Sequence, residues 1–134
     1  NAVIDGVDIS KDMIQISREK KIYRNLLELN LEDPLDHLLN NYSAVVSAGT
    51  FTHGHLGSES LGRLISHFKR GTKFVIGINF DHYNSKGFEK KFNALIKSNI
   101  IESFELSEVK VYNKDNEDLN IKNSKAFVCL FSKT

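Results

Sequence analysis

The chain has 134 residues, which is the length of one domain. Its composition is 40% hydrophobic and 26% charged, which is ordinary for a globular protein and excludes a disordered chain. Eighteen basic residues against seventeen acidic residues leave a formal charge of +1. This balance excludes a strongly basic nucleic-acid binder, so we expect no nucleic-acid partner.

Cysteine usage and hydropathy indicate the compartment. The one cysteine, Cys129, lies in an apolar run, and a buried free thiol fits a reducing environment. No apolar run approaches the ~18 residues that a membrane span requires. We therefore expect a cytoplasmic protein with no membrane partner.

The N-terminal third of the chain predicts two strands and a helix. Residues 2–8 are mostly apolar and end in an acid, which is typical of a short buried strand. Ser10 is placed to cap a helix over 11–22, because its hydroxyl can accept an N–H of the first turn. The leucines of 26–29 predict a second strand, and Pro34 then breaks the chain.

The middle of the chain continues the alternation. Residues 42–48 predict a third strand, followed by a loop rich in Gly, His and Thr. Apolar residues within 61–68 recur at the spacing of one helix face, and Gly71 is the expected C-cap of that helix. Residues 73–80 predict a fourth strand.

The C-terminal third adds a helix and a hairpin. Ser85 is expected to cap a helix whose apolar residues within 88–96 share one face. Residues 100–112 and 126–132 predict two long strands joined by a polar segment. Strands that alternate with helices predict one α/β domain over 1–134, a Rossmann-like three-layer α/β/α fold. Its sheet is expected to be mostly parallel, with an antiparallel C-terminal hairpin strand.

Ligands bind outside the carboxyl ends of the strands in an open parallel sheet. The first strand ends in Asp8, and a carboxylate there can accept hydrogen bonds from a nucleotide ribose. The alternative is a simple turn acid at the start of a helix. The Gly-rich segment after the third strand lets the backbone approach a ligand closely, and the alternative there is an ordinary strand-to-helix turn.

Four residues with metal-binding side chains are expected on loops at the same edge: His53, His55, Asp81 and His82. Two histidines and a carboxylate can form a facial metal triad. His-x-His on a loop is a weak signal, however, so we favour solvated or substrate-facing histidines and predict no metal site. The basic residues between 11 and 24 are interrupted by Asp12 and Glu19, which favours a solvated helix face over a nucleic-acid surface.

Two motifs resemble those of class I S-adenosylmethionine-dependent methyltransferases. Residues 5–13 (DGVDISKDM) resemble the family's second strand and following helix, where the pattern is G-[VI]-D-[IL]-S-x-x-M. Residues 45–55 (VVSAGTFTHGH) are similar to its fourth-strand motif, and 30–31 fall where the third-strand acidic motif lies. The closing hairpin also matches the family's seven-stranded sheet.

The resemblance implies S-adenosylmethionine as cofactor and transfer of its methyl group to an unidentified small-molecule acceptor. It implies that Asp8 binds the ribose hydroxyls, that Ile9 packs against the adenine and that Met13 lines the adenine side. Asn30 would bond the adenine amino group, where the family more often has Asp. Leu31 would offer its backbone N–H to the ring.

The fourth-strand motif implies the rest of the site. Ser47, Gly49 and Thr50 would lie beside the methionine moiety of the cofactor. His53 directly follows the strand part of this motif, and we predict it as the catalytic general base for acceptors that arrive protonated. The alternative is that His53 only lines the substrate pocket.

One family feature is missing from the chain. The family's first strand carries a G-x-G-x-G loop around the methionine end of the cofactor, and this sequence contains no G-x-G. Either the chain is an N-terminally truncated methyltransferase, which its start at Asn-Ala-Val favours, or it has lost cofactor binding. The alternative function is a non-catalytic interaction protein of the same fold. Without the family's first strand, parallel sheet edges would be left exposed, which predicts a homodimer or a swapped assembly.

Overall fold

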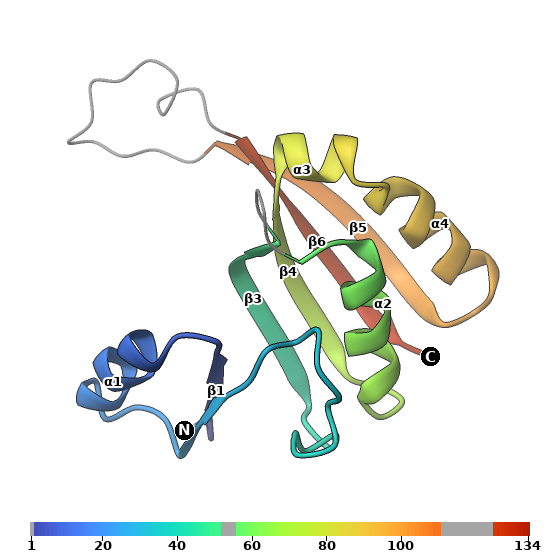
Figure 1. The fold of residues 1–134 in the computed structure, drawn as a ribbon. Coiled ribbons are helices and arrows are strands. Elements are labelled where there is room, and N and C mark those ends of the chain that lie inside the picture. The colour runs from blue at the N-terminus through green and yellow to red at the C-terminus, as the bar shows by residue number, and fades with distance from the viewer. Residues whose placement is uncertain (1, 52–55, 111–124) are drawn as a thin grey trace, which may run out of the picture. The chain divides into compact units, whose positions relative to one another are not determined.

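The computed structural model describes residues 2–51, 56–110 and 125–134. The chain divides into an N-terminal unit, Asn1–Leu35, and a C-terminal unit, Asp36–Thr134. Each unit has its own sheet, with two strands in the first and four in the second (Figure 1). Within the described ranges, none of the helices has the length and apolar character to cross a bilayer.

The N-terminal unit contains three elements in chain order: β1 (Asp5–Asp8), α1 (Lys11–Glu19) and β2 (Asn25–Glu28). The two strands are parallel neighbours, and α1 contacts both. Ser10 caps α1 as predicted, because its Oγ accepts the N–H of Met13 at 3.3 Å. The helix ends earlier than predicted, since Lys21 has a φ of 55°, a left-handed conformation that cannot continue a helix.

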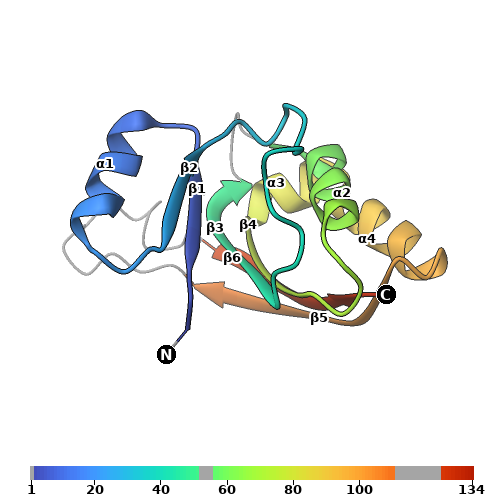
Figure 2. The same ribbon diagram turned by 90° about the horizontal axis from the view of Figure 1, so that it is seen from below.

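The described residues of the C-terminal unit form seven elements: β3 (Ala44–Phe51), α2 (Ser58–His67), β4 (Lys73–Asn79), α3 (Phe80–Ser85), α4 (Phe88–Lys97), β5 (Ile101–Lys110) and β6 (Lys125–Lys133). The strand order is β3-β4-β6-β5. β3 and β4 are parallel, whereas β6 is antiparallel to both of its neighbours. The predicted hairpin is thus confirmed, and the mostly parallel sheet only in part, because this sheet is mixed. Figures 1 and 2 show α2, α3 and α4 on one face of it.

The short helix α3 corrects the prediction for this part of the chain. Asn79, at the end of β4, caps α3 because its side-chain oxygen accepts the N–H of His82 at 3.1 Å. Ser85 is therefore the last residue of α3 and not the cap of the next helix; its hydroxyl donates to the carbonyl of Asp81 at 2.7 Å. The residue before α4 is Gly87, with a φ of 76°.

The predicted cap of α2 is also wrong. The helix ends at His67, and Phe68 is its C-cap in an extended conformation. Gly71 has a φ of 90° and lies in the turn into β4, where its N–H donates to the carbonyl of Lys133 at 2.8 Å. The left-handed conformation that favours glycine is thus used in the turn rather than at the helix end.

The core of the C-terminal unit lies between the four-stranded sheet and its three helices. Phe74 of β4 and Phe131 of β6 stack in it with ring centroids 4.9 Å apart. Cys129 lies fully buried in the same layer, and burial raises the pKa of its thiol to about 12. The other fully buried apolar side chains among the described residues are Phe51, Leu61, Ile65, Ile76, Ile78, Phe88, Phe92 and Ile101.

One close approach joins two helices of this unit. Lys91 of α4 crosses Gly62 of α2, so that a Cβ added at Gly62 would lie 2.6 Å from the Cε of Lys91. The Lys91 ammonium lies 3.5 Å from the Glu59 carboxylate of α2. The lack of a side chain at Gly62 therefore makes room for the aliphatic part of the lysine.

Candidate functional site

The carboxyl ends of β1 and β2 meet at one edge of the N-terminal unit. The strands are parallel and in register, with Asp8 beside Glu28. The carbonyl of Asp8 accepts the N–H of Leu29 at 3.0 Å. This bond brings the segment after β2, with Asn30 and Leu31, to the same edge as Asp8. The edge is the place where parallel α/β sheets bind ligands.

Asp8 supplies the carboxylate of this edge. It is half-buried, and its Oδ1 accepts the N–H of Ser10 at 2.9 Å. The turn role that we considered for Asp8 is therefore present. Within the described part of the chain, no other donor reaches this carboxylate, so Oδ2 remains an acceptor for a ligand. The bond to Ser10 also holds the carboxylate in place ahead of α1.

Two exposed apolar side chains follow this carboxylate within five residues of the sequence. Ile9 follows Asp8 directly and is 64% exposed, and Met13 in the first turn of α1 is 48% exposed. Exposed large apolar side chains at a strand edge offer a surface for an apolar ring. Both residues were predicted to contact adenine, and both are accessible.

Asn30 builds the turn that follows β2. Its side-chain oxygen accepts the N–H of Glu32 at 2.9 Å, and its carbonyl accepts the N–H of Asp33 at 2.9 Å. A carbonyl oxygen has two lone pairs, so the amide oxygen of Asn30 has capacity for one more donor. Its predicted role at an adenine amino group would share this oxygen with the turn.

Three predicted residues lie on β3 of the C-terminal unit. We expected a Gly-rich loop after residue 48, but β3 continues to Phe51 with a bulge between Ser47 and Phe51. Gly49 takes the positive φ of 76° in this bulge, and Thr50 is half-buried. The Oγ of Ser47 is buried and has no hydrogen-bond partner among the described residues.

The histidines divide into two groups. The predicted catalytic base His53, and His55 beside it, lie outside the described residues. His82 was expected on a loop with Asp81, but both lie in α3. His82 is buried, its Nε2 lies 2.8 Å from the carbonyl oxygen of Leu56, and its ring packs on Phe88. Across residues 2–51, 56–110 and 125–134, no three His, Cys, Asp or Glu side chains gather as metal ligands.

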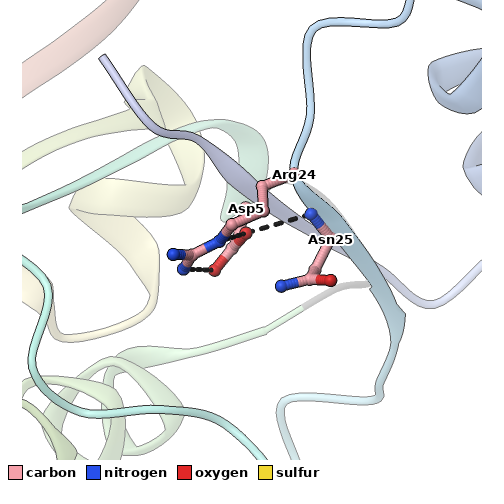
Figure 3. Close-up of polar contacts among 3 residues, drawn as sticks. All are labelled: Asp5, Arg24 and Asn25. Atoms are coloured by element: carbon pink, nitrogen blue, oxygen red, sulfur yellow. Dashed lines mark hydrogen bonds and ion pairs between the residues drawn. The ribbon is translucent and has the colours of Figure 1, made fainter.

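An ion pair in the N-terminal unit escaped the sequence prediction. The Arg24 guanidinium donates to both carboxylate oxygens of Asp5, at 3.0 and 2.6 Å (Figure 3). The two residues meet because β1 and β2 pair with Asp5 beside Asn25. No local signal marks this pair, since it depends on the register of two strands.

Comparison with protein-family models and with curated proteins finds no match. Solved structures do match. A TehB-like SAM-dependent methyltransferase from Corynebacterium glutamicum ATCC 13032 is 15% identical with a TM-score of 0.62, covering 98% of this chain and 68% of that chain. The chain has the fold of S-adenosylmethionine-dependent methyltransferases. At 15% identity the likeness is one of fold.

Two further methyltransferase structures share this fold and differ in what they are named for. The plantazolicin methyltransferase BpumL, solved in complex with S-adenosylhomocysteine (SAH), is 13% identical with a TM-score of 0.61, covering 99% of this chain and 67% of that chain. An rRNA methylase from Streptococcus thermophilus is 13% identical with a TM-score of 0.54, covering 98% and 73%. The fold alone therefore does not select an acceptor.

Proposed function

We propose that this chain binds S-adenosylmethionine through the edge formed by Asp8 and serves methyl transfer to a small-molecule acceptor. The observation that carries the proposal is the Asp8 carboxylate, held by Ser10 at the carboxyl end of β1 with Oδ2 available to a donor. The methyltransferase fold supports it, and BpumL of the same fold was solved with SAH.

The groups at this edge fit the nucleoside end of the cofactor. A carboxylate oxygen is the acceptor that ribose hydroxyls need. The exposed Ile9 and Met13 offer apolar surface to the adenine ring. Asn30 and Leu31 follow β2 at the same edge, where we propose that they bond the edge of the ring.

For the C-terminal unit, we propose that Ser47, Gly49 and Thr50 contact the methionine moiety. The buried Ser47 Oγ lacks a partner among the described residues, and a hydroxyl in that state favours any ligand that supplies one. Gly49 is exposed, and no atom of the described residues lies within 4 Å of the place where its Cβ would be. A polar group of a ligand can therefore approach its backbone closely.

The chemistry asks little of the protein beyond placement. A bound S-adenosylmethionine supplies a methyl group on a sulfonium, which is a good leaving group. The chain must hold the acceptor in line with this methyl group and exclude water. We propose His53 as the base for an acceptor that arrives protonated, on its position after the fourth-strand motif. An unchanged methyl-transfer rate in His53→Ala would refute this role.

Calorimetric titration with SAH tests cofactor binding. We expect saturable binding by the wild-type chain and a loss of about tenfold to a hundredfold in affinity for Asp8→Ala, because a hydrogen bond to a charged group is removed. The matched control is Asp12→Ala, which removes an exposed carboxylate from the first turn of α1. We expect this control to bind SAH like the wild type.

Two results would count against the proposal. A folded wild-type chain that does not bind SAH would favour the alternative, a non-catalytic interaction protein of methyltransferase fold. An equal loss of affinity in Asp8→Ala and Asp12→Ala would show that general charge, rather than the Asp8 edge, holds the ligand.

We also propose that the chain self-associates as a homodimer through β3. This strand is the end strand of the four-stranded sheet, and its Val46 is 73% exposed. Unpaired strand edges template pairing with another chain. Sedimentation velocity over a range of concentrations tests this, with Val46→Lys as the weakened variant. A monomer at the highest concentration would refute the dimer.

A further inference from the structure

The N-terminal unit contains a cavity at the end of its sheet opposite to Asp8. The cavity has a volume of about 250 Å³ and lies between the last turn of α1 and the start of β2. It is lined by Ser17, Arg18, Tyr23, Arg24, Asn25 and Leu26. Asp8 lies three residues further along β1 than the partner of Asn25, roughly 10 Å away along the strand. The cavity is therefore separate from the proposed cofactor edge.

The guanidinium of Arg24 is held in a fixed orientation in the cavity wall. Its Nε and Nη2 donate to the two carboxylate oxygens of Asp5, and Asp5 Oδ1 also accepts the N–H of Asn25 at 3.0 Å (Figure 3). Asp5 is only 9% exposed, whereas the Arg24 side chain is 52% exposed. A two-point pair fixes the plane of a guanidinium, so less rotamer freedom is lost when a ligand binds to it.

Arg18 supplies a second guanidinium to the same wall. It lies in the last turn of α1 and is exposed. The lining includes two arginines and no acidic residue. The Asp5 carboxylate, which is paired with Arg24, neutralises one of the two positive charges. Lys20 and Lys21 follow in the chain and are also exposed, and Glu19 is the one acidic residue between Arg18 and Lys21. The hydroxyls of Ser17 and Tyr23 and the amide of Asn25 add neutral hydrogen-bonding groups.

We propose that this cavity binds a phosphate group. Two guanidiniums, one of them already oriented, match the tetrahedral oxygens of a phosphate, and neutral donors beside them complete such a site. The phosphate can belong to a small phosphorylated ligand or to a nucleic-acid backbone, because both present the same anion. The site goes beyond the proposed methyl transfer and does not depend on cofactor binding.

A ¹H–¹⁵N NMR titration of the full chain with inorganic phosphate tests the site, with sodium chloride adjusted to keep the ionic strength constant. We expect saturable shifts at the amides of Tyr23, Asn25 and Leu26. Arg18→Ala should weaken phosphate binding about fivefold, since one exposed charge pair is lost, and Arg18→Lys should restore part of it. The matched control is Lys11→Ala, at the other end of α1, which should bind phosphate like the wild type.

Two outcomes would overturn the proposal. One is the absence of saturable shifts around the cavity in the folded chain. The other is an equal loss of phosphate binding in Arg18→Ala and Lys11→Ala, which would show general ionic attraction. Unchanged SAH binding by Arg18→Ala would separate this site from the cofactor edge, so the two proposals can fail independently.

A second arm identifies the source of the phosphate. The same variants are titrated with a single-stranded RNA oligonucleotide without a terminal phosphate. Tighter binding of RNA than of inorganic phosphate, lost in Arg18→Ala, would assign the site to a nucleic-acid backbone and contradict the predicted absence of a nucleic-acid partner. Binding of inorganic phosphate alone would assign it to a small phosphorylated ligand.

Discussion

The interactions inside the N-terminal unit differ from those inside the C-terminal unit. The C-terminal unit buries a layer of aromatic and aliphatic side chains between a sheet and three helices. In the described part of the N-terminal unit only Ile14 and Leu35 are buried, while Ile9, Met13 and Ile16 are exposed. Its contacts include the two-point ion pair between Asp5 and Arg24. Stability is thus concentrated in one unit, and the groups suited to ligands are concentrated in the other.

A core truncation in the C-terminal unit should have the largest effect. Phe92 is buried against the rings of Tyr83, Phe104 and Phe131. Phe92→Ala is expected to lower the free energy of unfolding by about 3–5 kcal/mol, because it leaves a cavity in a packed core. Urea denaturation followed by circular dichroism measures the loss.

The matched truncation in the N-terminal unit is Ile16→Ala, on the exposed side of α1. It should change the free energy of unfolding by less than about 1 kcal/mol, since the side chain is already in water. If the two truncations cost the same, the difference between the units is not one of buried apolar packing.

Alkaline pH should destabilise the C-terminal unit. Burial raises the pKa of Tyr83 from 10.0 to about 12, and that of Cys129 from 9.0 to about 12. Both groups bind their proton more tightly in the folded state. The stability they contribute is fully present below pH 9 and is lost as the pH rises toward 12.

Midpoints of urea denaturation measured from pH 8 to pH 11 test this. We expect the midpoint to fall as the pH rises. Tyr83→Phe and Cys129→Val should each make the decline shallower, because each removes one group whose pKa is raised. A decline of unchanged slope in the double variant would contradict the assignment. At pH 8 the buried Cys129 thiol should also react slowly with thiol reagents, since it is protonated.

The most local expected effect lies in the N-terminal unit. Asp5→Asn keeps an oxygen for the N–H of Asn25 but removes the charge that faces Arg24. We expect a loss of about 1 kcal/mol, since Arg24 is half exposed and water screens the pair. Hydrogen exchange should become faster at Arg24, whose N–H donates to the carbonyl of Ile4, and stay unchanged in β4.

The control is Glu108→Gln in the C-terminal unit, which breaks an exposed pair with Lys125 at 3.1 Å. Exchange in β1 and β2 should not respond to it. Faster exchange in β4 after Asp5→Asn would mean that the two units unfold together rather than one before the other.

Elements defined by buried periodicity were predictable from the sequence. β4 and β6 follow from apolar runs of strand length, β5 follows from a partial alternation of apolar and polar residues, and α1 follows from its cap Ser10 and the helical pattern after it. α3 was not predictable in this way, because its cap is the side chain of Asn79, which also ends β4. The bulge at Gly49 was not predicted, because glycine and the polar residues around it are also typical of a loop. The sequence therefore does not show that the strand continues to Phe51.

In the candidate site, too, local patterns were predictable from the sequence and contacts between distant residues were not. Asp8 could be singled out because a carboxylate at a strand end next to a helix cap is a local pattern, and its neighbour Ile9 follows from position. The Asp5–Arg24 pair and the cavity beside it could not, because their residues meet only through the register of β1 and β2. The spacing of two residues in a single sequence does not predict whether their side chains meet across neighbouring strands.

The lysine that crosses Gly62 makes two positions mutationally dependent. A glycine inside a helix costs about 1 kcal/mol relative to alanine, so α2 accepts this cost while Lys91 occupies the space. Gly62→Ala alone would displace the flexible end of Lys91 from Glu59, whereas the same change with a short residue at position 91 would bring the helix-forming gain without the clash. Under selection for stability, positions 62 and 91 should therefore change together. A short residue at position 91 should come first, because Gly62→Ala is then free of the clash with Lys91.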